Sequence, residues 1–321
     1  MSRFLACQSI LEAFGHTPLI ELNNLCSGLP GKVFAKAEFL NPGGSMKDRI
    51  ALQMIQAAEQ SGQLRPGVPV VEVTSGNTGI GLAIVCAVKG YQFIAVMSAG
   101  NSPERKLILE ALGAEVVLVP QHPGGKPGQV TGEDLKLVED HGKKLADQLK
   151  AYFVNQFNNA SNPAAHAQTT AAEIISQLNG KVDIFLDVVG TGGTFVGTAS
   201  ALKLHNPAIK CLALEPATAP ILAGKPVTNP QHKLQGSSYA MIPPLWKPDI
   251  CDGYLTISDD EAIMMARLLA SREGILVGYT AGANVAAALK IAQDCPLGTN
   301  IVTILCDSGM KYLSSDLFNR N

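Results

Sequence analysis

The sequence lacks paired cysteines. Its seven cysteines are odd in number, are scattered singly from Cys7 to Cys306, and never form a CxxC pair. A disulfide framework needs an even, regularly spaced set, and a zinc site needs ligands in short pairs. We therefore expect reduced thiols, with neither a disulfide scaffold nor a metal site.

Long runs of one residue type are also missing. The 25 basic and 27 acidic residues are interspersed, so no nucleic-acid or anionic membrane partner is expected. No apolar stretch approaches the roughly 20 residues that span a bilayer. The first residues reach Glu12 and His16 without the apolar core of a signal peptide. We expect a cytoplasmic protein that acts on a small molecule.

Short apolar runs alternate with helical patterns along most of the chain. The predicted strands cover residues 68–73, 93–98, 115–120, 182–189, 210–216 and 300–306. Helices are predicted over 45–61, before Gly62, and over 78–90 and 103–113, which end at Gly90 and Gly113. Such alternation is typical of parallel sheets with crossover helices, and strands apolar on nearly every residue are buried on both faces. The fold class is therefore α/β.

The first of four glycine-rich turns is NPGGSMKDR, at 41–49, which places Lys47 in the first turn of a helix. Ser45 is the predicted N-cap and Asp48 its capping partner. A cation is disfavoured at the positive end of a helix dipole, and the same field favours the neutral amine that a Schiff-base lysine requires. A lone lysine is more often an exposed surface residue, so a chemical role for Lys47 requires further motifs elsewhere in the sequence.

The second turn is EVTSGNTGIGLA, at 72–83, where a buried strand leads into two glycines around Asn77 and then into a helix. Backbone N–H groups of such a turn, with the hydroxyls of Thr74, Ser75 and Thr78, form a cradle for an anion such as a carboxylate. A simple helix N-cap would explain one hydroxyl, but not three hydroxyls and an amide.

The third turn is DVVGTGGTFVG, at 187–197, whose glycines and hydroxyls are those of a phosphate-binding loop. A tight structural turn is the simpler alternative. The turn has no P-loop lysine, and Phe195 occupies the place of the third glycine of the dinucleotide fingerprint. A nucleotide triphosphatase and a nicotinamide dehydrogenase are therefore poor interpretations.

The fourth turn, ILVGYTAGANVAAALKIA at 275–292, puts Thr280 between a strand and an alanine-rich helix. The simplest interpretation is an N-cap threonine. The functional one is a neutral hydroxyl beside the nitrogen of a cofactor ring. A hydroxyl, unlike a carboxylate, does not keep a pyridine ring protonated, which favours elimination over transamination.

Five motifs in this order resemble the cysteine synthase family of pyridoxal-phosphate enzymes, which is related to cystathionine β-synthase. They are NPGGSMKDR, EVTSGNTGIGLA, VGTGGTFVG, GYTAGANVAAAL and CDSGMKYL, and they extend over nearly the whole chain. The resemblance implies fold type II: two three-layer domains with parallel sheets, and pyridoxal 5'-phosphate in the cleft between them. It implies a smaller, mobile substrate-closing domain at 41–158, a larger phosphate-binding domain at 1–40 plus 159–321, and a homodimer.

The resemblance also implies a role for each matching residue. Lys47 corresponds to the Schiff-base lysine and catalytic base, Asn77 to the amide beside the cofactor's ring hydroxyl, and Thr280 to the hydroxyl beside its pyridine nitrogen. The phosphate loop comprises Gly190, Thr191, Gly192, Gly193 and Thr194. The expected substrate contacts are Thr74, Ser75, Asn77, Thr78 and Gln156, with Gly236 at the start of a loop that covers the substrate.

Two segments depart from the family pattern. Ser237, Ser238 and Tyr239 follow Gly236 where cysteine synthases carry a small, glycine-rich stretch. The segment 121–132, rich in glycine and proline, is predicted to be a surface insertion or flap. Either difference can change the leaving group or the nucleophile that is accepted.

The function implied by the resemblance is β-replacement on a serine-derived amino acid, foremost cysteine synthesis from O-acetylserine and sulfide. Lyases that eliminate and stop, such as serine or threonine dehydratase or cysteine desulfhydrase, remain alternatives. So does a condensation like that of cystathionine β-synthase. A catalytically silent member that binds another protein is a further alternative, and an acyltransferase whose C-terminal tail enters the cleft is the partner it suggests.

Overall fold

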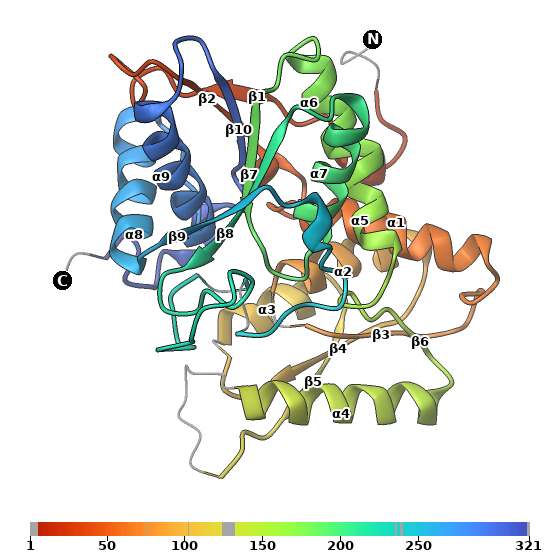
Figure 1. Ribbon diagram of the computed structural model, residues 1–321. Coiled ribbons are helices and arrows are strands. Elements are labelled where there is room, and N and C mark those ends of the chain that lie inside the picture. Colours follow the sequence, from red (N-terminus) through yellow and green to blue (C-terminus); the bar gives the residue numbers. More distant parts are fainter. Residues whose placement is uncertain are drawn as a thin grey trace. The chain divides into compact units, whose positions relative to one another are not determined.

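The computed structural model of the chain describes residues 6–74, 76–101, 103–123, 132–234, 236–237 and 240–319. These residues fall into two compact units, each of which draws on separate parts of the chain (Figure 1). The first unit comprises the N-terminal stretch through Gly15, Asn41–Gly43 and Lys47–Ser161. The second comprises His16–Leu40, Gly44–Met46 and the chain from Asn162 onward.

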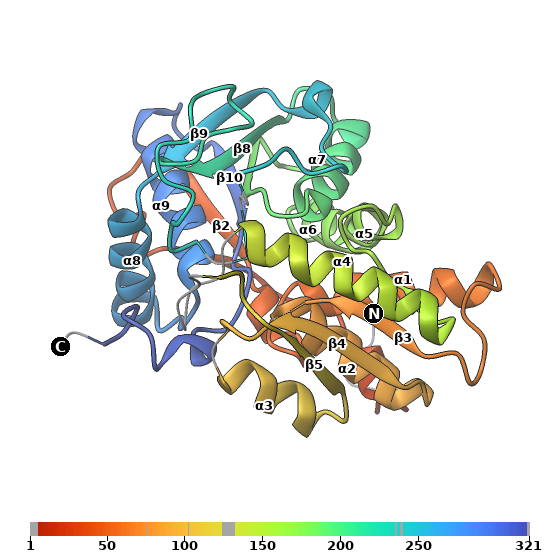
Figure 2. The same cartoon turned by 90° about the horizontal axis from the view of Figure 1, so that it is seen from below.

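The first unit is built on a parallel sheet of four strands in the order β5-β4-β3-β6. The strands are β3 (Val70–Val73), β4 (Phe93–Ser98), β5 (Glu115–Val119) and β6 (Tyr152–Phe153). Helix α4 (Gly132–Leu149) covers one face, and the other is covered by α1 (Lys47–Gln60), α2 (Asn77–Lys89) and α3 (Pro103–Ala111) (Figure 2). The unit therefore has three layers.

The contact between the sheet and α4 is apolar and close. Val71, Ile94 and Val96 of the sheet form one buried cluster with Val138 and Ala146 of α4. A Cβ added at Gly142 would lie only 2.5 Å from Cγ2 of Val73, so the glycine lets α4 approach β3. Since Val71 and Val73 face α4, strand alternation turns the side chain of Glu72 toward the opposite face.

The second unit contains a sheet of six strands in the order β1-β2-β10-β7-β8-β9. Its strands are β1 (Leu19–Glu21), β2 (Lys32–Lys36), β7 (Ile184–Val188), β8 (Lys210–Pro216), β9 (Gly253–Ile257) and β10 (Asn300–Ile304). Strand β1 pairs antiparallel with β2, and the other described neighbours in this sheet are parallel. Helices α8 (Asp259–Leu268) and α9 (Tyr279–Asp294) lie on one face, and α6 (Ala172–Gln177) and α7 (Gly193–His205) on the other (Figure 1).

Shorter helical segments complete the described chain. Helix α5 (Ser161–Ala165) runs into the π-helical segment His166–Ala171, and a second π-helical segment, Leu269–Glu273, follows α8. The 3-10 segments are Ile10–Ala13, Glu38–Leu40, Pro248–Ile250 and Gly309–Tyr312. Within the described part of the chain, no helix has both the length and the apolar character needed to cross a membrane.

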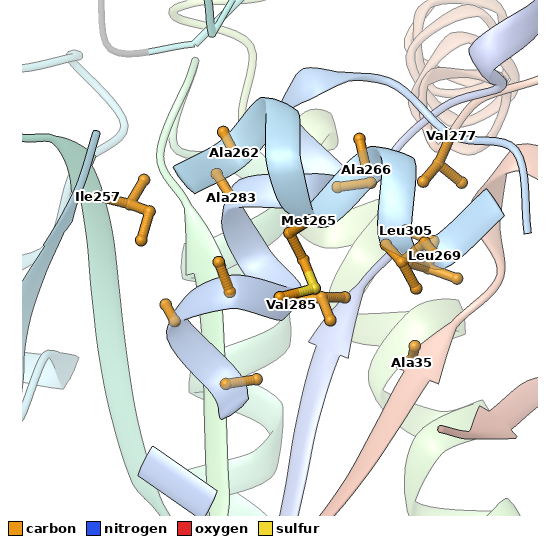
Figure 3. Close-up of a cluster of buried hydrophobic side chains, with 14 of the residues drawn as sticks. Ala35, Ile257, Ala262, Met265, Ala266, Leu269, Val277, Ala283, Val285 and Leu305 are labelled. Carbon is orange, nitrogen blue, oxygen red and sulfur yellow. The ribbon is translucent and has the colours of Figure 1, made fainter. Parts of the chain in front are cut away.

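Small side chains allow α8 and α9 to pack closely on the second sheet (Figure 3). Met265 and Ala266 of α8 are buried against Ala283 and Val285 of α9 in the same apolar cluster. A Cβ added at Gly282 would lie 2.2 Å from the carbonyl oxygen of Ala262, a distance that real atoms do not tolerate. Gly282 thus fixes the separation of the two helices and holds the start of α9 in place.

The predicted elements are largely confirmed. All six predicted strands are present, as β3, β4, β5, β7, β8 and β10, and the α/β fold class holds. Helix α1 begins at Lys47 itself, two residues after the predicted cap Ser45, which instead forms an isolated β-bridge with Asp307. Strands β1, β2, β6 and β9 were not predicted. Most of the predicted flap at 121–132, namely 124–131, lies outside the described residues.

Candidate active site

Lys47 opens α1 and is partly buried. A Cβ added at Gly81 of α2 would lie 3.0 Å from the carbonyl oxygen of Lys47 and 3.0 Å from Cβ of Ala51. Gly81 therefore lets α2 lie against the first turn of α1. This close packing places Lys47 and the beginning of α2, with Asn77 as its first residue, in the same part of the first unit.

The turn before α2 is held by the hydroxyl of Thr74. Its Oγ1 accepts hydrogen bonds from the N–H of Gly79 at 3.0 Å and of Gly76 at 3.5 Å. The N-cap of α2 is Gly76, which has no side chain. No side chain of the N-cap residue therefore accepts hydrogen bonds from the first N–H groups of the helix. Ser75, the remaining hydroxyl of the predicted cradle, lies outside the described residues.

Thr78 and Gln156 are far apart in the sequence but in direct contact. The hydroxyl of Thr78 donates to Oε1 of Gln156 at 2.7 Å, and both side chains are buried. Nε2 of Gln156 donates in turn to Oε1 of Glu72 at 3.5 Å. The structure thus brings together two of the residues predicted to bind a substrate carboxylate, and adds a buried acid beneath them.

The loop at 190–194 precedes α7 and depends on glycine at each of its three glycine positions. The N-cap Gly192 has φ +89°, a left-handed conformation that favours glycine. A Cβ at Gly193 would lie 1.8 Å from Oδ1 of Asn162, and one at Gly190 would lie 2.8 Å from the carbonyl oxygen of Gly236. The loop therefore consists of backbone without side chains at its glycines, and it leads directly into the N-terminus of α7, the kind of position at which anions bind.

The two hydroxyls of this loop are held by neighbours within the second unit. Oγ1 of Thr191 accepts from Nδ2 of Asn162 at 3.0 Å. Oγ1 of Thr194 lies 3.2 Å from Nε2 of the buried His166 and donates to Sδ of Met46 at 3.4 Å. The N–H of Met46 binds the carbonyl oxygen of Cys306 at 3.0 Å. Met46, the residue before Lys47, is therefore anchored to the loop within the second unit.

The strand leading into the loop rests on a buried polar network. Nδ2 of Asn284 in α9 donates to Oδ1 of Asp187 at 2.8 Å and to the carbonyl oxygen of Ile304 at 2.9 Å. Its Oδ1 accepts from the N–H of Val188 at 2.9 Å. One asparagine therefore joins α9, β7 and β10 at the point where β7 enters the loop.

Thr280 is the second residue of α9, whose N-cap is Gly278. The simpler prediction, an N-cap threonine, is therefore wrong. A Cβ added at Gly278 would lie 2.4 Å from Oδ1 of Asp307 and 2.5 Å from Cε2 of Tyr312. The last motif, CDSGMKYL, thus packs against the start of α9 and fixes the backbone next to Thr280.

Gly236 has φ +78°, and its carbonyl oxygen passes close to Gly190. The hydroxyl of the buried Ser237 donates to the carbonyl oxygen of Leu234 at 2.8 Å, so it stabilises its own loop. Ser238 and Tyr239, the other two unusual residues of this segment, lie outside the described residues.

Several residues of these clusters were not predicted from the sequence. Asn162, His166 and Met46 support the 190–194 loop, and Glu72 lies behind Gln156. Arg105 of α3 places Nη1 3.5 Å from the position of a Cβ at Gly76. The one signal available was a polar residue within an otherwise apolar strand, Glu72 in VPVVEV. Among the described residues, no group of three or more His, Cys, Asp and Glu is arranged to hold a metal ion.

Comparison with known proteins gives consistent matches over nearly the full length. The family model for pyridoxal-phosphate dependent enzymes matches residues 10–307. A cysteine synthase of Staphylococcus aureus is 42% identical over 313 residues, which cover 97% of each chain. Among solved structures, a hydrogen sulfide-producing enzyme of Fusobacterium nucleatum has a TM-score of 0.89 and 40% identity, covering 97% of this chain and 99% of that one. O-acetyl serine sulfhydrylase isoform 3 of Entamoeba histolytica has a TM-score of 0.91 and 36% identity, covering 99% of this chain and 93% of that one.

Proposed function

Because the chain belongs to the family of pyridoxal-phosphate dependent enzymes, we propose that it replaces the β-substituent of a serine-derived amino acid, foremost making cysteine from O-acetylserine and sulfide. One structural observation supports this proposal independently of the similarity to known proteins. Met46, which directly precedes Lys47, contacts Thr194 in the 190–194 loop. A lysine amine and a phosphate-binding loop, joined through adjacent residues, are what a cofactor with an aldehyde and a phosphate requires.

The described residues fit pyridoxal phosphate. Any Cβ at Gly190 or Gly193 would collide with neighbouring atoms, so the loop is formed by backbone rather than side chains. Backbone N–H groups at a helix start bind a phosphate dianion through hydrogen bonds and through the helix dipole. We assign the phosphate to residues 190–194, the ring hydroxyl to Asn77 and the ring nitrogen to Thr280.

Lys47 is the residue to which we assign the covalent link and the proton transfer. The bound cofactor withdraws electrons from the α-carbon of an amino acid and so makes its proton removable. With the cofactor bound, Lys47 would hold it covalently, and its amine Nζ, when free, would remove the α-proton as general base. Its position at the start of α1 favours the neutral amine that this step needs.

The 74–78 turn and Gln156 are assigned to the substrate carboxylate. The first N–H groups of α2 and the amide of Gln156 lie in this part of the first unit, and the hydroxyl of Thr78 holds that amide by donating to its Oε1. Binding the carboxylate there orients the α-carbon and excludes water from it. Thr74 takes part indirectly, because its hydroxyl accepts from the N–H of Gly79 and shapes the turn.

The roles of the two parts of the chain form part of the same proposal. We propose that residues 41–158 act as the mobile part that closes on the substrate and that 1–40 with 159–321 hold the cofactor phosphate. We also propose a cytoplasmic homodimer, with the C-terminal tail of an acyltransferase as a protein ligand. A light-scattering mass and a titration with such a tail peptide, followed by the cofactor's fluorescence, test these two assignments.

A lyase is the second candidate. A structural relative at 40% identity is a hydrogen sulfide-producing enzyme, and the segment after Gly236 departs from the glycine-rich stretch of cysteine synthases. Loss of hydrosulfide from cysteine, without a second nucleophile, would leave pyruvate and ammonia after hydrolysis. The lyase and the synthase share the same proton abstraction by Lys47, so they differ only in the later steps of the reaction.

The deciding experiment is a product balance on the purified holoenzyme. With O-acetylserine and sulfide, we expect one cysteine formed per acetate released, and little pyruvate. Pyruvate formation that equals acetate release whether or not sulfide is present would overturn the synthase in favour of the lyase. Lys47→Ala should abolish both, whereas Lys32→Ala, a change at an exposed residue of β2, should abolish neither.

A further inference from the structure

Glu72 is a buried acid with no place in the assignments above. It lies in the middle of β3, is 2% exposed, and faces the side of the sheet opposite α4. Acidic side chains are seldom fully buried unless they are paired, because removing a carboxylate from water is unfavourable. The position of Glu72 next to the 74–78 turn suggests that the residue has a specific task.

The contacts of Glu72 converge on the turn that carries Gln156. Its Oε1 accepts from Nε2 of Gln156, and the backbone N–H groups of Asn155 and Gln156 also stabilise its charged form. Its second oxygen, Oε2, has no hydrogen-bond partner among the described residues. Asn155 has φ +53°, a strained conformation for a residue with a side chain. Glu72 thus lies beneath a strained turn and binds its central residue.

The side chain of Gln156 is held from both ends. Thr78 donates to its Oε1, and its Nε2 donates to Glu72. If the amide were reversed, its carbonyl oxygen would face the acceptor oxygen of Glu72 instead. With its proton on Oε2, a neutral Glu72 still presents Oε1 to Gln156 as an acceptor, so it favours the amide orientation in which Oε1 of Gln156 faces Thr78.

We propose that Glu72 is a positioning residue that acts through Gln156 to prepare the site for the carboxylate of the amino-acid substrate. This inference rests on the proposed function, because it takes the Thr78–Gln156 pair as part of that carboxylate site. The role needs a neutral acid, since a negative charge behind Gln156 would repel the substrate carboxylate. Burial meets this need: it raises the pKa of Glu72 to about 8, against the opposing effect of the backbone N–H groups.

The groups that lower the pKa of Glu72 against the effect of burial are backbone N–H groups and the side chain of Gln156, rather than a cation. Strand β4 has no ionisable side chain, and β6 carries Tyr152, whose pKa is raised by burial and further by Glu72. Helix α2 carries Cys86, whose pKa burial raises to about 12, and Lys89, which pairs with Glu59 at 2.7 Å. Helix α1, which packs on α2, contributes the buried Asp48 and Arg49.

The kinetic test compares two substitutions in two backgrounds. Glu72→Leu removes the acceptor at similar volume, whereas Glu72→Gln keeps an acceptor oxygen and cannot ionise. We expect Glu72→Leu to raise KM for O-acetylserine about tenfold, the size of one hydrogen bond, with little change in kcat or in KM for sulfide. Glu72→Gln should return KM toward the wild-type value. In a Gln156→Ala background, Glu72→Leu should add nothing. An equal effect in both backgrounds would overturn the proposal.

A second measurement does not depend on turnover. Amide hydrogen exchange of the folded holoenzyme should be faster at residues 154–159 in Glu72→Leu and unchanged in Glu72→Gln, with α4 as an internal control. The carboxyl 13C resonance of Glu72, identified by its loss in Glu72→Gln, should titrate far above the other glutamates. Unaltered exchange in Glu72→Leu, or an ionised Glu72 at neutral pH, contradicts the proposal. If the wild type does not turn over O-acetylserine, the proposed function fails, and these two readouts still decide the role of Glu72.

Discussion

Thr194 donates a hydrogen bond from Oγ1 to Sδ of Met46, a residue 148 positions earlier in the chain, at 3.4 Å. Met46 is further fixed by its N–H, which binds the carbonyl oxygen of Cys306. The residue in front of Lys47 is therefore fixed to the loop that we assign to the cofactor phosphate. This contact links the two chemical requirements of the cofactor, an amine and an anion site, through one short piece of chain.

Removing the Thr194 hydroxyl should weaken cofactor binding. In Thr194→Val the loop loses its bond to Met46 and its contact with His166 while its volume is nearly unchanged. We expect the Kd for pyridoxal phosphate to rise about tenfold, the effect of a lost hydrogen bond of roughly 1.4 kcal/mol. Titration of the apoenzyme, followed by absorbance, measures it. Thr194→Ser keeps the hydroxyl and should bind normally; an equal loss in both variants would mean that the methyl group, not the hydroxyl, matters.

Gly193→Ala should damage the same loop for a steric reason. The new Cβ would lie 1.8 Å from Oδ1 of the buried Asn162, so either the loop or Asn162 must move. Overpacking of this kind costs roughly 1–3 kcal/mol. We expect a lower melting temperature and a cofactor affinity reduced at least tenfold. Gly253→Ala is the matched control, because its Cβ would meet only Cδ2 of Leu212, at 3.2 Å. Normal cofactor binding by Gly193→Ala would contradict the assignment of the loop.

Thr78→Val should impair substrate binding without impairing cofactor binding. The change removes the donor that meets Gln156 at 2.7 Å and leaves the buried amide oxygen without that bond. Loss of one such bond is worth about 1–1.5 kcal/mol, so KM for O-acetylserine should rise roughly tenfold. Steady-state kinetics with Thr78→Ser as control measure this effect. A fall in kcat with unaltered KM would place Thr78 in the chemical step instead.

The stability of the protein should depend on pH through Glu72. Because burial raises its pKa from 4.5 to about 8, the folded protein binds one more proton than the unfolded chain between these values. Stability contributed by this group is therefore lost as the pH rises through that window. Between about pH 6 and pH 9 the wild type should lose roughly 3 kcal/mol relative to Glu72→Gln. Denaturant unfolding at both pH values tests this, and parallel pH dependences for the two proteins would refute it.

The sequence predicts the parts of the fold that depend on local pattern. Strand β4 is a nearly continuous apolar run, and glycines follow α2 and α3 closely, so the positions of these elements could be inferred without tertiary information. Strand β2, KVFAK, carries a lysine at each end and pairs antiparallel with the three-residue β1. A three-residue strand, and a strand with a lysine at each end, lack the apolar run by which the other strands were predicted, so their existence depends on the sheet they join.

In the candidate site, too, local sequence patterns predict the motifs but not the contacts between them. Glycines and hydroxyls of the four turns stand in contiguous motifs, so their chemistry was visible in the sequence. The bonds from Thr78 to Gln156, from Asn162 to Thr191 and from Thr194 to Met46 join residues far apart in the chain. No local propensity specifies such pairs. The wrong interpretation of Thr280 as an N-cap has a similar cause, since the helix start is set by the packing of Gly278 against Tyr312.

The most direct test of the account is to locate the bound cofactor. Borohydride adds a hydride to the carbon–nitrogen double bond between lysine and cofactor, and a proton from water completes a stable secondary amine. Peptide mass spectrometry of the reduced holoenzyme then identifies the modified residue. We predict modification of Lys47 alone, abolished in Lys47→Ala and retained in Lys32→Ala. Modification of a different lysine, or a purified protein that binds no pyridoxal phosphate, would contradict the central claim.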